Sequence, residues 1–177
     1  YKRQVFGGHK SVHGEHYQET AAFVASAKTI RTVIAMAAPQ DYKIVTWDIS
    51  QAFVFAKMEE GQDIYMELPP MIDEVGNKNS EKYKECGRSK CKSHVAKLKR
   101  YLYGQKDAPR AWARCIQEFC DSIGAESLIS DRMAFRWEWE GHEMNFAVHV
   151  DDLVATPSSE AIRAEFHRRL EDYFGAD

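Results

Sequence analysis

Acidic residues stand at two places in this chain where the neighbouring residues are apolar. Asp48 closes the run from Ile44 to Trp47, and the pair Asp151-Asp152 interrupts an apolar stretch between Phe146 and Val154. Removing a charged carboxylate from water is costly, so acids among strand-like apolar residues require either a partner or a function.

Two explanations fit these acids. Adjacent Asp residues favour tight turns, so the pair could simply close a β-hairpin. Alternatively, the carboxylates supply hard oxygen ligands for Mg²⁺, which binds a few carboxylates together with substrate phosphates. Two ions about 4 Å apart would stabilise the attacking and leaving oxygens of a phosphoryl transfer. Because Asp48 and Asp151 are 103 positions apart, this chemistry requires a fold that brings two strand ends together.

Other residue types offer weaker signals. Cys86, Cys91 and His94 lie close together in a Lys-rich stretch, but a zinc site there lacks a nameable fourth ligand. We expect the remaining cysteines to be core thiols, the early histidines to be surface residues and the tryptophans to pack in the core rather than stack on bases. These residues are Cys115 and Cys120; His9, His13 and His16; and Trp47, Trp112, Trp137 and Trp139.

Composition indicates one globular domain or two small ones. The chain has 177 residues, of which 44% are hydrophobic and 12% aromatic, so wholesale disorder is excluded. The net charge of −3 argues against a purely electrostatic nucleic-acid binder. It conceals an asymmetry, however: residues 81–114 hold eleven Lys or Arg against three acids, and residues 137–177 hold ten acids against three bases. Such a division can attract a polyanion at one place and cations at another.

Targeting signals are not evident. No apolar run approaches the length of a membrane span, and no secretory signal is recognisable. Four cysteines are too few for a disulfide scaffold and favour a reduced, intracellular setting. Because the chain begins at Tyr1 rather than Met, we expect it to be part of a longer protein.

The apolar periodicity predicts a mixed α and β chain. We expect a loop or insertion over residues 71–93, and an inward face of Ile162, Phe166, Leu170 and Phe174 on the last helix. The predicted helices are 19–38, a short one within 52–58, 110–123 and 160–174, and the predicted strands are 42–49, 64–68, 95–103, 135–139, 145–150 and 153–156.

Six stretches, read in order, resemble the reverse transcriptase of copia-type LTR retrotransposons. They are HYQET (16–20), TIRTVIAMAA (29–38), WDISQAFV (47–54), DIYMELPP (63–70), KLKRYLYGQKDAPRAW (97–112) and HVDDLVAT (149–156). Their order and approximate spacing match over nearly the whole chain. A lone Val-Asp-Asp would be a weak signal, whereas six stretches in register are specific.

The resemblance implies an α+β fold, the fingers and palm of a right-hand polymerase, with a ferredoxin-like antiparallel palm sheet backed by helices. Residues 1–45 and 55–110 would be largely fingers, and 46–54 and 111–177 largely palm. The thumb, connection and RNase H parts of the Pol polyprotein would be absent from this stretch.

The resemblance also assigns the catalytic acids. Asp48, Asp151 and Asp152 would be the catalytic aspartates, of which Asp48 and Asp151 bridge two Mg²⁺ ions, with Mn²⁺ as a possible substitute. Asp152 would be less directly engaged, and the backbone carbonyl of Ile49 would complete one metal shell.

Further residues are implied as contacts to nucleotide and nucleic acid. Phe53 would lie beneath the sugar of the incoming nucleotide, and the amides of Gln51 and Ala52 would face its phosphates. The other implied nucleotide-binding residues are Lys2, Arg3, Tyr103 and Gly104, and the implied nucleic-acid contacts are Lys97, Lys99, Arg100, Arg110, His149 and Val150.

The implied activity is RNA-directed DNA polymerisation by two-metal phosphoryl transfer. The implied partners are an RNA or DNA template with primer, deoxynucleoside triphosphates and the rest of the Pol polyprotein, with no membrane. Such an enzyme would act inside the cell, in a cytoplasmic particle, the nucleus or both.

Two alternatives stay open. A decayed or domesticated element fragment could keep the fold and bind nucleic acid without polymerising. An unrelated ferredoxin-like RNA-binding domain would need exposed aromatic residues on its sheet, whereas here the central hairpin carries acids. The chain also departs from the family pattern, with His149 where Tyr is usual and Gln-Lys-Asp at 105–107 where Leu-Lys-Gln is common.

Overall fold

The computed structural model describes residues 6–14, 17–67 and 95–175. The predicted loop over 71–93, with Cys86, Cys91 and His94, lies outside the described residues. The chain divides into two compact units. The larger unit is formed by the residues up to Lys57 and from Arg100 onwards, and the smaller unit by the intervening residues of the sequence, Met58–Lys99.

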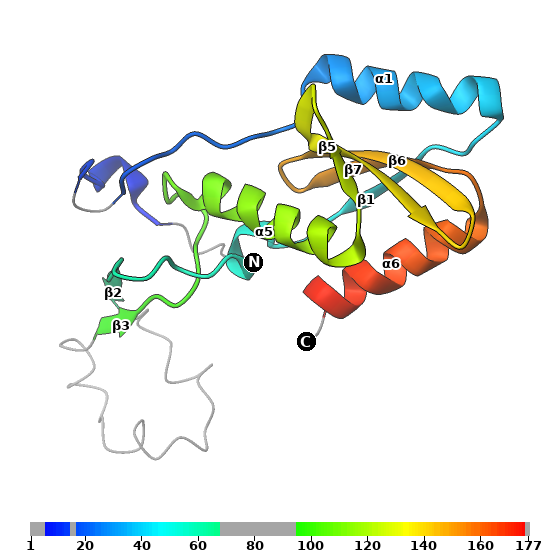
Figure 1. Cartoon of the computed structure of the whole chain (residues 1–177). Helices are drawn as coiled ribbons and strands as arrows, with labels where there is room; N and C mark the ends of the chain where they lie inside the picture. The colour runs from blue at the N-terminus through cyan, green and yellow to red at the C-terminus, as the bar shows by residue number, and fades with distance from the viewer. Residues whose placement is uncertain (1–5, 15–16, 68–94, 176–177) are drawn as a thin grey trace. The chain divides into compact units, whose positions relative to one another are not determined.

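The larger unit contains a five-stranded antiparallel sheet and three longer helices (Figure 1). Its strands are β1 (Val45–Asp48), β4 (Glu126–Leu128), β5 (Asp131–Trp139), β6 (His142–His149) and β7 (Asp152–Pro157). Its helices are α1 (Ala27–Ala37), α2 (Ala52–Phe55), α5 (Ala108–Ile123) and α6 (Glu160–Phe174), with short 3₁₀ turns η1 (Gly8–Lys10) and η2 (Ala38–Gln40). The mixed α and β prediction, with an antiparallel sheet, is therefore confirmed.

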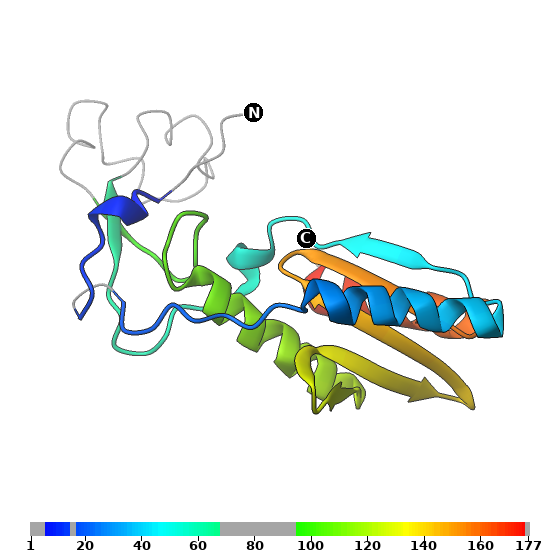
Figure 2. The same ribbon diagram turned by 90° about the horizontal axis from the view of Figure 1, so that it is seen from above.

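The strand order is β1-β7-β6-β5-β4, so the last strand in sequence lies between the first strand and the β5–β6 hairpin. Helix α1 packs on one face of the sheet, over β6 and β7, and α5 and α6 pack on the other (Figures 1 and 2). The site residues described below lie in this larger unit unless stated otherwise.

Aromatic side chains of the strands gather on the face that α5 and α6 cover. The register pairs Phe135 with Phe146 and Trp137 with Met144, and paired residues project from the same face. Phe166 of α6 packs against both Phe146 and Trp137, with ring centroids 5.0 and 5.6 Å apart. Trp112 and Trp137 are core residues as predicted, and Trp47 and Trp139 pack against the core while partly buried. The rings of Phe135, Trp137 and Phe146 are buried and not displayed as an RNA-binding sheet face would require.

Helix α6 matches its sequence pattern fully. Its buried residues are the four that the periodicity predicts, Ile162, Phe166, Leu170 and Phe174. Ser159 begins the helix as an N-cap, its side chain accepting a hydrogen bond from the Ile162 amide at 3.4 Å. The cysteines of α5 are also as predicted: Cys120 is buried, and burial raises the pKa of the partly buried Cys115 thiol to about 11.

The first helix begins later than its periodicity predicts. Residues 19–26 are not helical, and α1 starts at Ala27 after the N-cap Ser26. Ser26 is held in place from a distance: its amide donates to Oδ2 of Asp131 at 2.9 Å, and Thr29 Oγ1 donates to the same oxygen at 2.6 Å. The Ala25 amide donates instead to the Val148 carbonyl. Contacts with β5 and β6 therefore override the local helical pattern.

Asp131 makes folding of the larger unit sensitive to acid. Partial burial alone would raise the pKa of its carboxyl, but hydrogen bonds from Ser26, Thr29 and the Met133 amide outweigh it and lower the pKa below 3.8. A carboxyl with a lowered folded-state pKa stabilises the fold above its unfolded pKa and loses that contribution as the pH falls through the folded value. We expect the free energy of unfolding to fall between about pH 5 and 2 more steeply in the wild type than in Asp131→Asn, measured by urea titration. Parallel curves would contradict this role.

The predicted and observed elements also differ elsewhere. Strand β1 starts at Val45 rather than 42, and β5 and β6 start at Asp131 and His142 rather than 135 and 145. Helix α5 starts at Ala108 rather than 110, because Pro109 occupies its first turn, where a missing amide proton is harmless. Strand β4 was not predicted, since all three of its residues are exposed and leave no alternating pattern. The stretch 95–103 is a strand only over β3 (Val95–Lys97).

In the part of the smaller unit that the structure describes, β3 pairs antiparallel with β2 (Tyr65–Glu67). The Leu98 amide donates to the Ile64 carbonyl at 2.9 Å, and Nζ of Lys97 lies 2.5 Å from Oδ1 of Asp63. In the described part of the chain, no helix is both long and apolar enough to cross a membrane.

Candidate active site

The pair Asp151-Asp152 lies at the tight turn between β6 and β7. His149 pairs with Asp152, which leaves Val150 and Asp151 as a two-residue loop. Val150 has φ of +59°, and Asp151 is not among the positive-φ residues, a sign pattern typical of a type II′ turn. The hairpin explanation and the functional explanation of these acids are thus compatible, because the turn displays the carboxylates at the end of two core strands.

The first acid, Asp48, lies beside this turn. It ends β1, and the register pairs it with Asp152 of β7. Just beyond the strand, the Ile49 amide donates to the Asp151 carbonyl at 2.9 Å. Backbone pairing therefore joins acids that are 103 positions apart in the chain, which is the condition that the metal hypothesis imposed.

A polar row crosses three strands at this end of the sheet. Asp48, Asp152 and His149 are successive cross-strand partners on β1, β7 and β6, so all three project from the same face. Asp48, Asp152 and His149 are exposed, and Asp151 is half-buried. The His149 ring is oriented by Nδ1, which hydrogen-bonds the carbonyl oxygen of Ala25 at 3.1 Å.

These groups have the chemistry of a Mg²⁺ site. The carboxylates of Asp48, Asp151 and Asp152 and the carbonyl of Ile49 are hard oxygen donors of the kind that this ion prefers. Among the described residues, no three acidic, histidine or cysteine side chains lie close enough together to hold a metal ion.

The residues after Asp48 form a short helical platform. Gln51 is left-handed, with φ of +61°, and leads into the single turn of α2. The α2 residue Ala52 is buried, and Phe53 is half-buried against Tyr103, with ring centroids 4.7 Å apart. The structure therefore brings together two of the predicted nucleotide-binding segments, around Phe53 and around Tyr103.

Tyr103 and Gly104 are the central residues of a β-turn. The Gln105 amide donates to the Leu102 carbonyl at 3.2 Å, and the buried Gln105 side chain accepts from the Leu102 amide at 2.6 Å. Gly104 has φ of +95°, which the third residue of a type II turn requires and which glycine adopts without strain. This turn presents the Tyr103 ring to Phe53.

The N-terminal segment packs on the same turn. The Phe6 amide donates to the Tyr103 carbonyl at 2.7 Å, and a Cβ placed on Gly8 would lie only 1.9 Å from the Gly104 carbonyl oxygen. Lys2 and Arg3, which were predicted to contact the triphosphate, lie outside the described residues. Their chain nevertheless enters the described region beside Tyr103 and Gly104.

Gly8 provides a test of this packing. We expect Gly8→Ala to detach the segment at 6–10, because the added methyl group would overlap a backbone oxygen that cannot move aside. Limited proteolysis should then cleave near residue 10 about tenfold faster, with little change in the unfolding of the sheet. Gly7→Ala is the matched control, since a Cβ at Gly7 meets its nearest atom at 3.6 Å. Equal cleavage of both variants would contradict the close packing.

The side chains of Lys97, Arg100 and Arg110, three of the predicted basic contacts, have partners within the protein. Arg100 Nη1 donates to the carbonyls of Val54 and Phe55 at 3.3 and 2.9 Å, so this residue supports the end of α2. Arg110 forms an ion pair with Glu19 at 3.1 Å. Lys97 and Lys99 belong to the smaller unit, where Lys97 pairs with Asp63.

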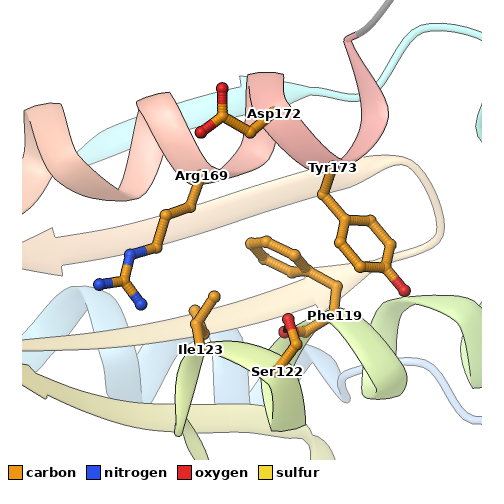
Figure 3. A pocket seen from close by; sticks show the side chains of 6 residues that line it. All are labelled: Phe119, Ser122, Ile123, Arg169, Asp172 and Tyr173. Carbon is orange, nitrogen blue, oxygen red and sulfur yellow. Dashed lines mark hydrogen bonds between the residues drawn. The ribbon is translucent and has the colours of Figure 1, made fainter.

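A cavity of about 260 Å³ lies elsewhere, between α5 and α6 (Figure 3). Phe119, Ser122 and Ile123 line it from α5, and Arg169, Asp172 and Tyr173 line it from α6. None of these six is a residue that the sequence suggested for chemistry.

Sequence reasoning missed the residues that support the acidic turn. Trp112 Nε1 donates to the Val150 carbonyl at 2.5 Å, and the Ala25 amide donates to the Val148 carbonyl at 2.9 Å. No local signal reveals such partners, because an apolar or aromatic residue in a helical pattern predicts burial and not the backbone group that it will contact.

Comparison with known proteins agrees with these observations. A family model described as reverse transcriptase (RNA-dependent DNA polymerase) matches residues 1–176. A retrovirus-related Pol polyprotein from transposon RE1 of Arabidopsis thaliana is 29% identical over 154 residues, which cover 87% of this chain and 9% of that protein. One from transposon TNT 1-94 of Nicotiana tabacum is 27% identical over 175 residues, covering 97% of this chain and 12% of that protein. No solved structure matches the chain.

The chain thus spans about a tenth of the length of these curated relatives. The family match covers almost every residue, and it includes Asp48, Asp151 and Asp152, whose backbones lie where the end of β1 meets the β6–β7 turn. The resemblance seen in the sequence is therefore confirmed, and the chain belongs to the reverse transcriptase (RNA-dependent DNA polymerase) family of retrotransposon Pol polyproteins.

Proposed function

We propose that this chain is the fingers-and-palm part of an RNA-directed DNA polymerase, which adds deoxynucleotides to a primer by two-metal phosphoryl transfer. The observation that supports it most is the pairing of β1 with β7, which places Asp48 opposite Asp152 and bonds Ile49 to the Asp151 backbone. A structural turn would need only the Asp151-Asp152 pair. The third acid, brought in from a distant part of the chain, favours a ligand site.

In this proposal Asp48 and Asp151 are the principal metal ligands, with Asp152 and the Ile49 carbonyl as supporting oxygens. Two bound Mg²⁺ ions would supply charge stabilisation for the attacking and leaving oxygens. The chain itself contributes position. Asp48 and Asp152 lie on paired strands, and Asp151 lies in the tight turn between β6 and β7, which a backbone hydrogen bond joins to the end of β1.

The nucleotide would lie over α2. The left-handed Gln51 turns the chain so that the amides of Gln51 and Ala52 begin a helical turn, where backbone N–H groups lack partners within the helix. Phe53 would then support the sugar, backed by Tyr103. Lys2 and Arg3 would reach the triphosphate from the segment that packs on Gly104.

The domain assignment follows from these roles. We assign 46–54 and 111–177 to a ferredoxin-like palm, which contains nearly all of the five-stranded sheet, most of α5 and all of α6. We assign 1–45 and 55–110 largely to the fingers. The primed template, deoxynucleoside triphosphates and the rest of the polyprotein would be the partners. The sites of action would be a cytoplasmic particle, the nucleus or both.

Primer extension with Mg²⁺ tests the activity, and the salt dependence of primer–template binding tests the basic contacts. Most of the binding free energy should come from counterion release, so affinity should fall steeply with salt. We expect Lys97→Gln with Lys99→Gln to flatten the slope of log affinity against log salt by up to about two units. Arg100→Gln would also loosen α2, so it is measured separately.

The exposed residues Lys28 and Lys43 provide the control, as Lys28→Gln with Lys43→Gln should leave the slope unchanged. An equal change in both double variants would place the template path elsewhere. Binding without any extension, with the fold intact, would instead support the alternative of a domesticated fragment that has kept only its affinity for nucleic acid.

A further inference from the structure

We propose that Trp112 is a positioning residue for the acidic turn: its indole N–H holds the strained backbone of Val150 and thereby fixes Asp151 beside Asp48. This inference deepens the proposed function and rests on it for the role of the acids. It concerns a contact between α5 and the β6–β7 turn that involves no reacting group.

Strain in the turn is the first observation. Val150 has φ of +59°, a left-handed conformation that a β-branched residue avoids because its Cβ crowds the following carbonyl. The favoured residue at this position of a type II′ turn is Gly. Strained backbone persists only where surrounding contacts over-determine it. Val150 therefore needs an external restraint.

Trp112 supplies that restraint from outside the sheet. Its side chain is 2% exposed, and Nε1 donates to the Val150 carbonyl at 2.5 Å. The indole is itself held: its ring packs against Phe174 of α6, with centroids 5.3 Å apart. A water molecule could move together with the Val150 carbonyl, whereas the buried and packed indole cannot. The indole therefore restricts the position of this carbonyl more than a water molecule would.

The neighbouring backbone transmits this restraint to the metal ligands. The Asp151 carbonyl, one residue on, accepts from the Ile49 amide, so the turn and the end of β1 share one hydrogen bond. Phe174 also contacts Phe55 of α2, with centroids 5.4 Å apart. The α5–α6 core therefore touches both the acidic turn, through Trp112, and the α2 platform, through Phe55.

Trp112→Phe tests the role, because it keeps an aromatic ring and removes the N–H donor. It also shortens the ring system, a change in buried volume that the control below reproduces. The probe is Mn²⁺ alone, with binding followed by electron paramagnetic resonance. Groups that orient metal ligands typically change metal affinity by 10- to 100-fold. We expect Mn²⁺ affinity to fall about tenfold in Trp112→Phe, at the lower end of that range. Asp151→Asn identifies which bound Mn²⁺ belongs to the site.

Trp137→Phe is the matched control. Trp137 is also buried, and its Nε1 donates to a backbone carbonyl, that of Ile123 at 2.9 Å, far along the chain from the acidic turn. Both variants lose one buried hydrogen bond of the same kind, so both should lower the denaturant midpoint. Only Trp112→Phe should weaken Mn²⁺ binding. Equal loss in both variants, or in neither, would overturn the proposal.

Val150→Gly provides the second readout, which does not depend on metal or activity. Glycine adopts the left-handed conformation without strain, so the turn should then need its anchor less. We expect Trp112→Phe to shift the denaturant midpoint less in the Val150→Gly background than in the wild type. Equal shifts in the two backgrounds would show that Trp112 is only a core residue.

The two readouts separate the inference from the function. If the wild type and Asp151→Asn bind Mn²⁺ equally, the proposed metal site fails, while coupling between Trp112 and Val150 in unfolding would still establish the anchor. The wild type could instead bind Mn²⁺ through Asp151 while Trp112 and Val150 show no coupling in unfolding and Trp112→Phe shows no selective loss of Mn²⁺ affinity. That result would refute the role of Trp112 and leave the proposed metal site intact.

Discussion

Asp151→Asn is expected to abolish primer extension while leaving primer–template affinity nearly unchanged. Asn is the same size but lacks the charge that balances a divalent cation, so several kcal/mol of transition-state stabilisation should disappear. That corresponds to a loss of more than about a thousandfold in rate. The measurement is single-nucleotide extension of a primed template with Mg²⁺.

Two controls make this result interpretable. Asp121→Asn removes an exposed acid from α5, away from the β6–β7 turn, and should retain extension. Thermal unfolding should show that Asp151→Asn is folded, since this side chain is half-exposed and its backbone carbonyl, not its carboxylate, bonds to Ile49. Near-normal extension by folded Asp151→Asn would refute the two-metal mechanism.

The second large effect is expected at Phe53, in the choice between deoxyribonucleotides and ribonucleotides. A pocket with room for an added hydroxyl rejects it poorly, whereas a rigid wall can exclude it by steric overlap. Phe53 fits this role because it is planar, has no polar atom, and is backed by the Tyr103 ring. Phe53→Val should raise incorporation of ribonucleotides relative to deoxyribonucleotides by about tenfold or more, which corresponds to about 1.4 kcal/mol of lost discrimination.

Phe55 gives a matched comparison on the same helical turn. Its ring packs on Phe174 of α6 instead of Tyr103, so it belongs to the core side of α2. Phe55→Val should leave sugar discrimination unchanged and lower stability by about 1–2 kcal/mol, less than the 3–5 kcal/mol typical of a fully buried Phe→Ala. Unchanged discrimination in Phe53→Val, with polymerisation intact, would show that another residue guards the sugar.

Local patterns predicted those parts of the fold that depend on local sequence. Helix α6 and the β5–β6 hairpin were recognisable because their apolar residues recur at helical or alternating spacing and their ends carry turn or capping residues. The same reasoning identified Asp48 and the Asp151-Asp152 pair as exceptional, because acids interrupt an otherwise apolar run. It also left the hairpin and the metal explanations equally open.

Periodicity failed where a distant residue decided the outcome. Residues 19–26 carry a helical pattern, but Asp131, 105 positions away from Ser26, bonds the Ser26 amide, and the helix begins after that residue. The exposed strand β4 has no pattern of its own and exists because β5 offers it an edge.

By itself, the sequence determined the family, the three acids and the elements that carry them, because residue types and local spacing are properties of the chain. Only the tertiary structure decided that β1 pairs with β7 in the register that places Asp48 opposite Asp152. It alone showed that Trp112 bonds the carbonyl of the left-handed Val150. Pairing between segments so far apart depends on the packing of the whole sheet between its helices, and no local pattern encodes that register.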